Sequence, residues 1–383
     1  MSNEIPSEVL EELEENFKHL HQYPETALNE FKTTALIKDY LTSKCTVELL
    51  DIGLDTGVLA IIKGDSKYGT VGFRADIDAL PLQEKTTLEY KSKISGCMHA
   101  CGHDAHTAIL LAFARWLSLN NPFKGNIVFL FQPAEEAEHG GQRVVEAGLF
   151  SKVKIDSFFA LHVSPELKVG QIAISAGPFS ANVDRFSYEI KGLGTHASTP
   201  YKGLNPIKAL EFLSNRLSSI VAQSIPCGDK ALISLTHVSS GSTWNIIPDS
   251  AFAEGTVRSF SAAARSTIIE KMTQLKTVLE SEGYKIEFNF IKGCPATNNA
   301  PKLSELIKEE VTKLGLTAVS QSANLGGEDF SCFQEHVPGA MFNLGTGIGA
   351  SLHNGAFKVD IDALKIGLMV FYRILSRIAN SKV

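Results

Sequence analysis

The stretch NIVFLFQPAEE, residues 126–136, joins an unbroken apolar run to a pair of glutamates. The run NIVFLFQ has the length and the apolar character of a strand that is buried on both faces. Strands of that kind occur in parallel sheets that helices cover on both sides. Glu135 and Glu136 therefore follow directly after a buried strand, at the edge where open α/β sheets bind their ligands.

Similar patterns recur on both sides of this stretch. Three more runs have the apolar and β-branched composition of strands, namely VLAIIKG (58–64), TVGFRAD (70–76) and SFFALHV (157–163). A strongly apolar helix is expected over 107–119, and two helices are expected within 8–41, separated by a break at Tyr23-Pro24. This alternation predicts an α/β domain with a helix-flanked, mostly parallel sheet.

The middle of the chain changes character. Helical spacing occupies 205–223 and 261–283, and strand patterns occupy 185–192, 231–240, 250–259 and 284–293. The resulting order, β-α-β-β-α-β, is the ferredoxin-like arrangement of an α+β domain. Strands and helices alternate again from about residue 301, so the α/β domain is predicted to be built from both ends of the chain. The expected ranges are 1–182 and 294–383 for that domain, and 183–293 for the inserted domain.

Composition excludes several classes of protein. The chain has 383 residues and a formal net charge of −6, whereas nucleic-acid binders usually carry a basic face. No run of about 18 apolar residues predicts a membrane span. The first residues are acidic, where a signal peptide would need basic and then apolar ones, so a cytoplasmic location is expected. Thiols stay reduced in that compartment, which argues against a disulfide between Cys97 and Cys101.

Polar residues gather where the predicted strands end. Besides the two glutamates, the candidates are Asp76 and Asp78 after 70–76, His162 at the end of 157–163, His353 after GAMFNLG (339–345), and the stretch CMHACGHDAH (97–106) before the helix at 107–119. Each has an ordinary alternative, such as a hydrogen-bonded core histidine, a solvated glutamate pair or a turn-capping aspartate. Their shared location at one rim of the sheet favours a functional site.

The residue types at this rim indicate a catalytic metal site. Cys97 and Cys101 are separated by three residues, so they do not form a redox Cys-x-x-Cys pair. A structural zinc site needs a second pair of ligands, and the other four cysteines each stand alone. A thiolate, which a helix N-terminus after Cys101 would favour, together with imidazoles and carboxylates suits one or two catalytic ions. In Glu135-Glu136, one carboxylate could bind metal and the other could act as general base.

The motifs taken together resemble one family. They are RADIDALP (74–81), MHACGHDAH (98–106), FQPAEE (131–136), LHV (161–163), KGLGTHAS (191–198), NIIPD (245–249), GTVR (255–258), GGEDF (326–330) and LHNGAF (352–357). In this order, over nearly the whole chain, they resemble the two-metal peptidase family of aminoacylases and glutamate carboxypeptidases. Within it the chain is similar to the bacterial aminoacylases, hippurate hydrolases and auxin-conjugate hydrolases.

The resemblance implies a role for each residue of the rim. The expected ligands of two divalent ions (zinc, manganese, cobalt or nickel) are Cys101, His103, Glu136, His162 and His353. Cys101 is implied to bridge the two ions. Glu135 is implied to act as general base and acid, and Asp78 is implied to orient a ligand imidazole. Asp76 stands where the wider family has a histidine, and His99, Asp104 and His106 are expected to make supporting contacts only.

The resemblance also implies a reaction and an assembly. The inserted domain matches a lid and dimerisation domain, with His196, Asn245 and Arg258 on the substrate side. His196 is expected to reach the active site of the neighbouring subunit of a homodimer. The implied activity is hydrolysis of the amide bond of N-acyl amino acids (acetyl, benzoyl or similar). The alternatives are a dipeptidase or oligopeptidase, an N-acetyl-diaminopimelate deacetylase, and a non-catalytic binding protein on the same scaffold.

Overall fold

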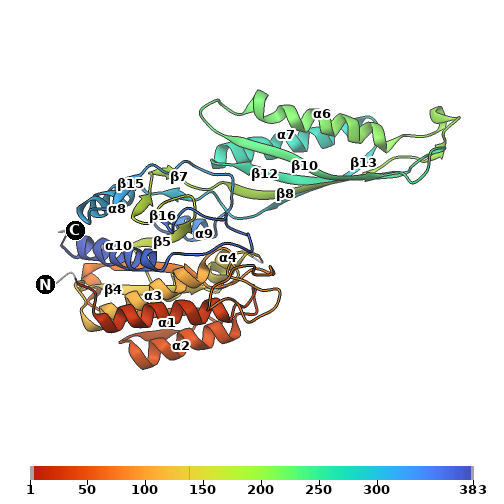
Figure 1. The fold of residues 1–383 in the computed structure, drawn as a ribbon. Coiled ribbons are helices and arrows are strands. Elements are labelled where there is room, and N and C mark those ends of the chain that lie inside the picture. The colour runs from red at the N-terminus through yellow and green to blue at the C-terminus, as the bar shows by residue number, and fades with distance from the viewer. Residues whose placement is uncertain (1–3, 138, 381–383) are drawn as a thin grey trace. The chain divides into compact units, whose positions relative to one another are not determined.

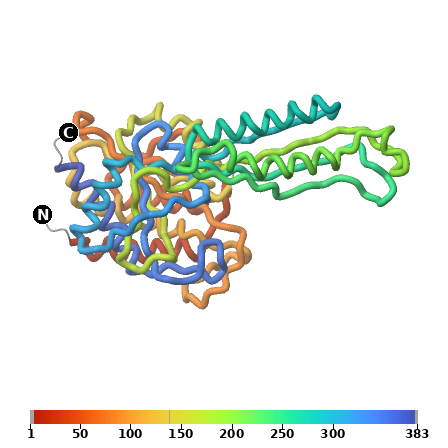
Figure 2. The backbone as a smooth tube through the Cα atoms, turned by 90° about the horizontal axis from the view of Figure 1, so that it is seen from above, coloured from red at the N-terminus to blue at the C-terminus, as the bar shows by residue number. Residues whose placement is uncertain are grey.

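The chain divides into two compact units. The computed structural model describes residues 4–137 and 139–380, so the first and last three residues of the predicted domain ranges lie outside it. Unit 1 comprises Met1–Phe179, Asn298–Ser322 and Asp329–Val383, and unit 2 comprises Ser180–Thr297 and Ala323–Glu328. The units therefore change at 179/180 and 297/298, beside the expected boundaries at 182/183 and 293/294. In Figures 1 and 2, unit 1 takes its colours from both ends of the scale, and unit 2 is mostly green and teal.

Unit 1 is built on a mixed sheet. Its strands are β1 (Glu48–Leu50), β2 (Val58–Ile62), β3 (Thr70–Asp76), β4 (Asn126–Gln132), β5 (Ser157–Ser164), β6 (Gln171–Ala173), β15 (Thr317–Val319) and β16 (Gly339–Gly345). Within the described residues they pair in the order β1-β2-β4-β3-β5-β16-β6-β15. The central strands β4, β3, β5 and β16 run parallel to one another, while β1, β2 and β6 pair antiparallel with their neighbours β2, β4 and β16. A short antiparallel pair, β7 (Gly177–Pro178) with β14 (Asn298–Asn299), lies outside this sheet.

Helices cover both faces of the sheet (Figure 1). They are α1 (Ser7–Gln22), α2 (Phe31–Lys44), α3 (His103–Leu119), α4 (Gly140–Glu146), α5 (Leu149–Lys152), α8 (Pro301–Lys313), α9 (Phe330–Gln334) and α10 (Ile361–Asn380), with a 3-10 turn, η1, at Ser66–Tyr68. Along β4, Phe129 packs with α3 and α10 on one face, and Leu130 packs with α4 and α5 on the other. Both faces are apolar, which explains why the run at 126–132 does not alternate.

Unit 2 has the predicted order of elements. Its main elements are β8 (Asn182–Lys191), α6 (Pro206–Ser224), β10 (Ala231–Ser240), β12 (Ser250–Ser259), α7 (Ala262–Ser281) and β13 (Lys285–Lys292). The four strands form an antiparallel sheet in the order β10-β12-β8-β13. Between the main elements lie η2 (Pro200–Lys202) and a short strand pair, β9 (Thr195–His196) with β11 (Ile246–Ile247). The predicted α/β class, with a mostly parallel sheet and an inserted ferredoxin-like domain, is confirmed; three pairings of the large sheet are antiparallel.

Two further details bear on the sequence-based expectations. The helix expected from residue 107 begins at His103, so part of the CMHACGHDAH motif forms its first turn. No helix among the described residues is both long enough and apolar enough to cross a membrane.

Candidate metal centre

The parallel strands bring most of the predicted residues to one edge of unit 1. Because β4, β3, β5 and β16 are neighbours that run the same way, their carboxyl ends meet at that edge. Asp76 and Asp78 come from the end of β3, Glu135 and Glu136 follow β4, His162 lies in β5 and His353 follows β16. The N-terminus of α3 adds Cys101 and His103.

The side chains at this edge place sulfur, nitrogen and oxygen atoms close together. Sγ of Cys101 lies 3.4 Å from Nε2 of His162. Oε1 of Glu136 lies 3.2 Å from Nε2 of His353 and 3.9 Å from Nε2 of His103. Cys101 belongs to two triplets whose ligand atoms all lie within 4.8 Å of one another, one with His103 and His162 and one with Glu136 and His353. These triplets are two candidate ion positions that share one sulfur.

Asp78 holds the imidazole of His103 in one orientation. Nδ1 of His103 lies 2.9 Å from the backbone oxygen of Asp78 and 3.2 Å from its Oδ1. Both partners are acceptors, so the proton of the neutral ring belongs on Nδ1. Burial opposes a charge on this ring, but Asp76, Cys101 and Asp78 raise the pKa of His103 well above its ordinary value. In the neutral ring that a metal ion would require, Nε2 is the lone-pair nitrogen, and it is buried with no hydrogen-bond partner among the described residues. A buried ring nitrogen left in this state is what a metal ion would satisfy.

Gly102 allows α3 to start against the sheet. Its φ is +83°, a left-handed conformation that glycine adopts without steric cost. A Cβ at this position would lie 2.4 Å from Cγ2 of Val163 in the neighbouring strand. The glycine thus lets Cys101 and His103, on either side of it, approach His162 closely.

Asp76 lies behind the candidate ligands and is neutralised by other residues. Its Oδ2 contacts Nη1 of Arg74 at 2.9 Å, and its Oδ1 lies 2.5 Å from Nδ1 of His106. Burial favours the neutral carboxyl, but Arg74 and the nearby imidazoles outweigh it and hold the pKa of Asp76 well below its ordinary range. Burial lowers the pKa of His106 to about 4, and its Nε2 accepts a hydrogen bond from the backbone N–H of Val163 at 2.9 Å. A neutral His106 therefore donates from Nδ1 to Asp76.

A second network, which the sequence did not reveal, reaches the loop of Glu135. Gln132 accepts a hydrogen bond from Nε of Arg74 at 2.8 Å and donates one to Oδ2 of Asp329 at 3.0 Å. Asp329 also accepts from the backbone N–H of Gly141 at 2.7 Å, and its own N–H donates to Oε1 of Glu135 at 3.5 Å. Only the GGEDF motif, which contains Asp329, hinted at a role for this segment.

The pKa of the Cys101 thiol differs from what the sequence predicted. The helix N-terminus was expected to favour the thiolate, but burial raises the pKa of Cys101 well above its ordinary value despite the opposing effect of His103. For Glu136, burial also favours the neutral form, yet the adjacent His353 and His103 lower its pKa. A cation bound between these residues would offset the cost of burying a thiolate.

The backbone is strained at two points of this edge. Among the described residues other than glycine, Leu28, Ala134, His139 and His353 have positive φ, and Ala134 immediately precedes Glu135. Residues held in this conformation cluster at functional sites, where the surrounding structure compensates for the strain. Both the candidate ligand His353, with φ of +59°, and the loop that carries the two glutamates are thus held in defined conformations.

The other polar residues of the CMHACGHDAH motif point to a different cluster. Oδ2 of Asp104 lies 2.6 Å from Nδ1 of His21, whose Nε2 lies 3.3 Å from Oε1 of Glu84. Burial lowers the pKa of His99 to about 4, and neither of its ring nitrogens has a hydrogen-bond partner among the described residues. Asp104 and His99 therefore lie outside the ligand triplets.

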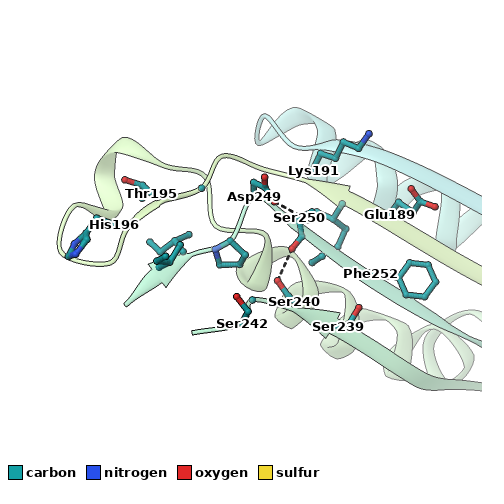
Figure 3. Close-up of a pocket in the computed structure, with 17 residues that line it drawn as sticks. Glu189, Lys191, Thr195, His196, Ser239, Ser240, Ser242, Asp249, Ser250 and Phe252 are labelled. Atoms are coloured by element: carbon teal, nitrogen blue, oxygen red, sulfur yellow. Dashed lines mark hydrogen bonds between the residues drawn. The ribbon is translucent and has the colours of Figure 1, made fainter. Parts of the chain in front are cut away.

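The predicted substrate-side residues lie in unit 2 and fall into two groups. His196 pairs with Ile246 between β9 and β11, and the backbone oxygen of Asn245 accepts from the N–H of Ala197 at 3.0 Å. The exposed ring of His196 lies 2.7 Å from Oγ of Ser198 through its Nδ1, and it borders a cavity of about 900 Å³ (Figure 3). Arg258 lies elsewhere, on β12 between β8 and β10.

The donor set at the edge of unit 1 fits a pair of divalent ions. The set consists of a soft sulfur, three imidazoles and a carboxylate, and Nε2 of one of these imidazoles, that of His103, lacks a hydrogen-bond partner among the described residues. Thiolate, imidazole and carboxylate together are ligands for zinc, manganese, cobalt or nickel. Glu135 forms a further triplet with His103 and Glu136, so a carboxylate outside the two sulfur-centred triplets lies within reach of both ion positions.

Comparisons with known proteins agree with this geometry. The chain is 39% identical over 357 residues to the N-acetylcysteine deacetylase of Bacillus subtilis (strain 168), with 92% of this chain and 93% of that protein covered. It is 34% identical over 362 residues to the N-acetyldiaminopimelate deacetylase of Listeria innocua, with 94% and 97% covered. A crystal structure described as a dinuclear metal-binding peptidase of the M20 family, from Bacillus subtilis, matches with a TM-score of 0.87 at 35% identity, covering 98% of this chain and 99% of that one.

The family pattern covers the whole of unit 2 and most of unit 1. The sequence pattern of the family described as Peptidase family M20/M25/M40 matches residues 72–377. This range includes every residue proposed above as a ligand, base or substrate contact. The chain therefore belongs to peptidase family M20/M25/M40, which confirms the resemblance carried by its ordered motifs.

Proposed function

We propose that this protein is a metal-dependent amidohydrolase that removes the acyl group from N-acyl amino acids. The observation that carries the proposal is the pair of ligand triplets that share Cys101, with the carboxylate of Glu135 beside them. The two deacetylases to which the chain is similar act, by their names, on N-acetyl amino acids. A thiolate ligand suits a reducing compartment, so we place the enzyme in the cytoplasm.

Five side chains are proposed to hold two divalent ions. His103 and His162 would bind one ion, Glu136 and His353 would bind the other, and Cys101 would bridge them, as the two triplets suggest. Asp78 would orient His103 through the contacts of its backbone oxygen and Oδ1. When bound, the ions would polarise the amide carbonyl and lower the pKa of the attacking water.

Glu135 is proposed to move the protons of the reaction. Its carboxylate would take a proton from the attacking water and later return that proton to the leaving amine. The N–H of Asp329, 3.5 Å from Oε1, supports one orientation of this carboxylate. Glu136 is unsuited to the same role because its Oε1 already faces His353 and His103.

The inserted domain is proposed to supply the substrate contacts and a dimer interface. Arg258 offers a planar guanidinium suited to the carboxylate of the amino acid, and His196 with Asn245 would contact the carbonyl side. Phe252 borders the same cavity as His196, and Arg258 lies six residues further along β12, which is about 20 Å of strand. An N-acyl amino acid is too short to span that distance. If both residues contact one substrate, His196 must come from a second copy of the chain.

A substrate panel tests the proposed reaction. We expect protein stripped of metal and reloaded with zinc, manganese, cobalt or nickel to hydrolyse N-acetyl or N-benzoyl amino acids with at least one of these ions. The kcat/KM for these substrates should exceed that for dipeptides by tenfold or more. The methyl ester of the best substrate should be much poorer, because it lacks the carboxylate for Arg258. Faster dipeptide cleavage would point to a peptidase, and inactivity with every ion would point to a binding protein.

Mixing two inactive variants tests the dimer. In hybrid dimers of Glu135→Gln and His196→Ala chains, one of the two sites would combine an intact Glu135 with an intact His196 from the other copy. Random mixing of equal amounts should therefore restore about one quarter of the wild-type activity. The control is a mixture of Glu135→Gln with Glu136→Gln, which should stay inactive. Activity that does not return on mixing would contradict a site shared between two copies.

A further inference from the structure

Glu30 is a fully buried carboxylate at the start of α2 that no motif singled out. It is 0% exposed and occupies the N-cap position of the helix. An N-cap side chain ordinarily accepts a hydrogen bond from its own helix, but that of Glu30 makes no such bond. Its Oε1 instead accepts from the backbone N–H of Ala134 at 2.8 Å, and its Oε2 accepts from Oγ1 of Thr56 at 2.8 Å. Burial raises the pKa of Glu30, so this carboxylate is placed there at a cost in solvation.

The residue that Glu30 holds is the strained one directly before Glu135. Ala134 has a φ of +55°, a left-handed conformation that is unfavourable for any residue with a Cβ. Such a conformation persists only where the surroundings fix it. The backbone oxygen of Ala134 accepts from the N–H of Gly140 at 3.0 Å, and a Cβ on Gly140 would lie 1.8 Å from the backbone oxygen of Pro133. The carboxylate of Glu30 binds the other side of the same residue, its N–H.

Besides the bonds to Ala134, the loop is held at Glu135, whose Oε1 accepts from the N–H of Asp329 at 3.5 Å, and at Glu136. The N–H of Glu136 donates to Oδ2 of Asp78 at 2.9 Å. Without the bond to Glu30, the left-handed conformation of Ala134 would be held by the bond from Gly140 but no longer at its own N–H, while Glu136 would stay fixed by Asp78. Loss of the bond to Glu30 would therefore mainly change the direction in which the side chain of Glu135 points, and it would move the candidate ligand Glu136 only weakly.

We propose that Glu30 is a positioning residue, which fixes the backbone of Ala134 and thereby aims the carboxylate of Glu135 at the site of proton transfer. The inference rests on the proposed role of Glu135 as general base. Glu30 acts through the hydrogen bond to Ala134 and makes no contact with substrate. A misplacement of about 1 Å in a reacting group can cost about 100-fold in rate, so a loss of this hydrogen bond should be visible in kcat.

Two conservative variants distinguish the effect of the side-chain length of Glu30 from the effect of its charge. Glu30→Gln keeps the length of the side chain, so its amide oxygen can accept from Ala134 and its amide group can donate to Thr56. Glu30→Asp keeps the charge but is one methylene shorter, which withdraws the acceptor by about 1.5 Å. We expect kcat of Glu30→Gln to stay within about threefold of the wild type. We expect kcat of Glu30→Asp to fall about 10- to 100-fold, with KM and the content of two ions per chain unchanged.

A readout that does not need turnover accompanies the kinetics. Hydrogen exchange followed by mass spectrometry on the peptide that spans residues 131–136 should show faster exchange of one protected amide in metal-free Glu30→Asp, but not in Glu30→Gln. Thr33→Val is the matched control, because this buried neighbour donates to Oε2 of Glu25 at 3.0 Å and has no recorded bond to the loop at 133–136. It should lower Tm about as much as Glu30→Asp, with kcat and exchange unchanged.

The outcomes distinguish this inference from the proposed function. An inactive wild type would contradict the proposed function, while unchanged exchange in Glu30→Asp would contradict the role of Glu30 even then. If the wild type is active, Glu30→Asp must lose kcat and Glu30→Gln must keep it. A larger loss in Glu30→Gln, or a loss of activity in step with a loss of metal, would overturn the positioning role.

Discussion

Replacing Glu135 with glutamine is expected to lower kcat for N-acyl amino acid hydrolysis by about 100- to 10,000-fold, the usual contribution of a general base. Glutamine has the same shape, and its side-chain oxygen can still accept from the N–H of Asp329, which lies 3.5 Å from Oε1 in the wild type. It cannot take up the proton of the attacking water. The two ligand triplets that contain Cys101 do not include Glu135, so the variant should still bind two ions per chain. Steady-state kinetics and metal analysis on the same sample measure both effects.

Glu136→Gln is the matched control for this experiment. Its carboxylate faces Nε2 of His353 at 3.2 Å and Nε2 of His103 at 3.9 Å, so it should lose activity together with bound metal. Glu135→Gln should therefore lose activity but keep its metal, whereas Glu136→Gln should lose both. If Glu135→Gln keeps activity within about tenfold of the wild type, Glu135 is not the general base and its assignment is wrong.

The buried strands and the order of the domains were predictable because each rests on a long pattern. The runs at 70–76 and 126–132 coincide with β3 and β4, since apolar residues face helices on both sides of the sheet. The alternation in the middle of the chain predicted unit 2 for a similar reason, because four long strands and two long helices leave a clear periodicity. The family and its reaction class followed from motifs in a fixed order, and the comparisons confirm them.

Other features leave no local signal. The strands β1, β6 and β15 have three residues each, which is too short for a periodic pattern. The start of α3 at His103 was missed because a glycine, Gly102, precedes the helix and polar residues occupy most of its first turn.

The supporting residues were missed because their partners are far away in the sequence. Glu30 binds a backbone N–H that is 104 positions away, and Gln132 binds Asp329 across 197 positions. A single sequence contains no pattern that connects such pairs. The candidate ligands and the candidate base could therefore be proposed from motifs, while the residues that hold them in place required the fold.

Replacing His21 with leucine is expected to destabilise the protein by about 3–5 kcal/mol, the usual cost of breaking a buried ion pair from one side. The ring is 3% exposed and lies between Asp104, at 2.6 Å, and Glu84, at 3.3 Å. Burial alone would lower the pKa of His21, but its hydrogen bonds to Asp104 and Glu84 outweigh burial and raise that pKa to about 10. Leucine would leave two buried carboxylates without their cation.

The pH dependence of this loss follows from the direction of the shift. The pKa of His21 is about 10 in the folded protein and about 6.5 when unfolded, so the folded state holds a proton that the unfolded state releases between these values. The stabilisation is complete below pH 6.5 and is lost as the pH rises toward 10. Urea unfolding of metal-free wild type and His21→Leu should give a difference in free energy that is largest near pH 6 and shrinks steadily toward pH 10.

His19→Leu provides the matched control, because His19 lies on the same helix, is exposed, and forms no ion pair that the structure records. Surface substitutions of this kind usually change stability by less than about 0.5 kcal/mol. Burial and Lys93 lower the pKa of His19, so its ring is neutral in both states well above the unfolded pKa of about 6.5, and from about pH 7.5 to 10 this variant should differ from the wild type by a small, pH-independent amount. A difference between wild type and His21→Leu that stays constant from pH 6 to 10 would show that His21 is neutral in the folded protein. In that case Asp104 and Glu84 would have to be stabilised by hydrogen bonds alone, and CMHACGHDAH would contribute no charge pair outside the metal centre.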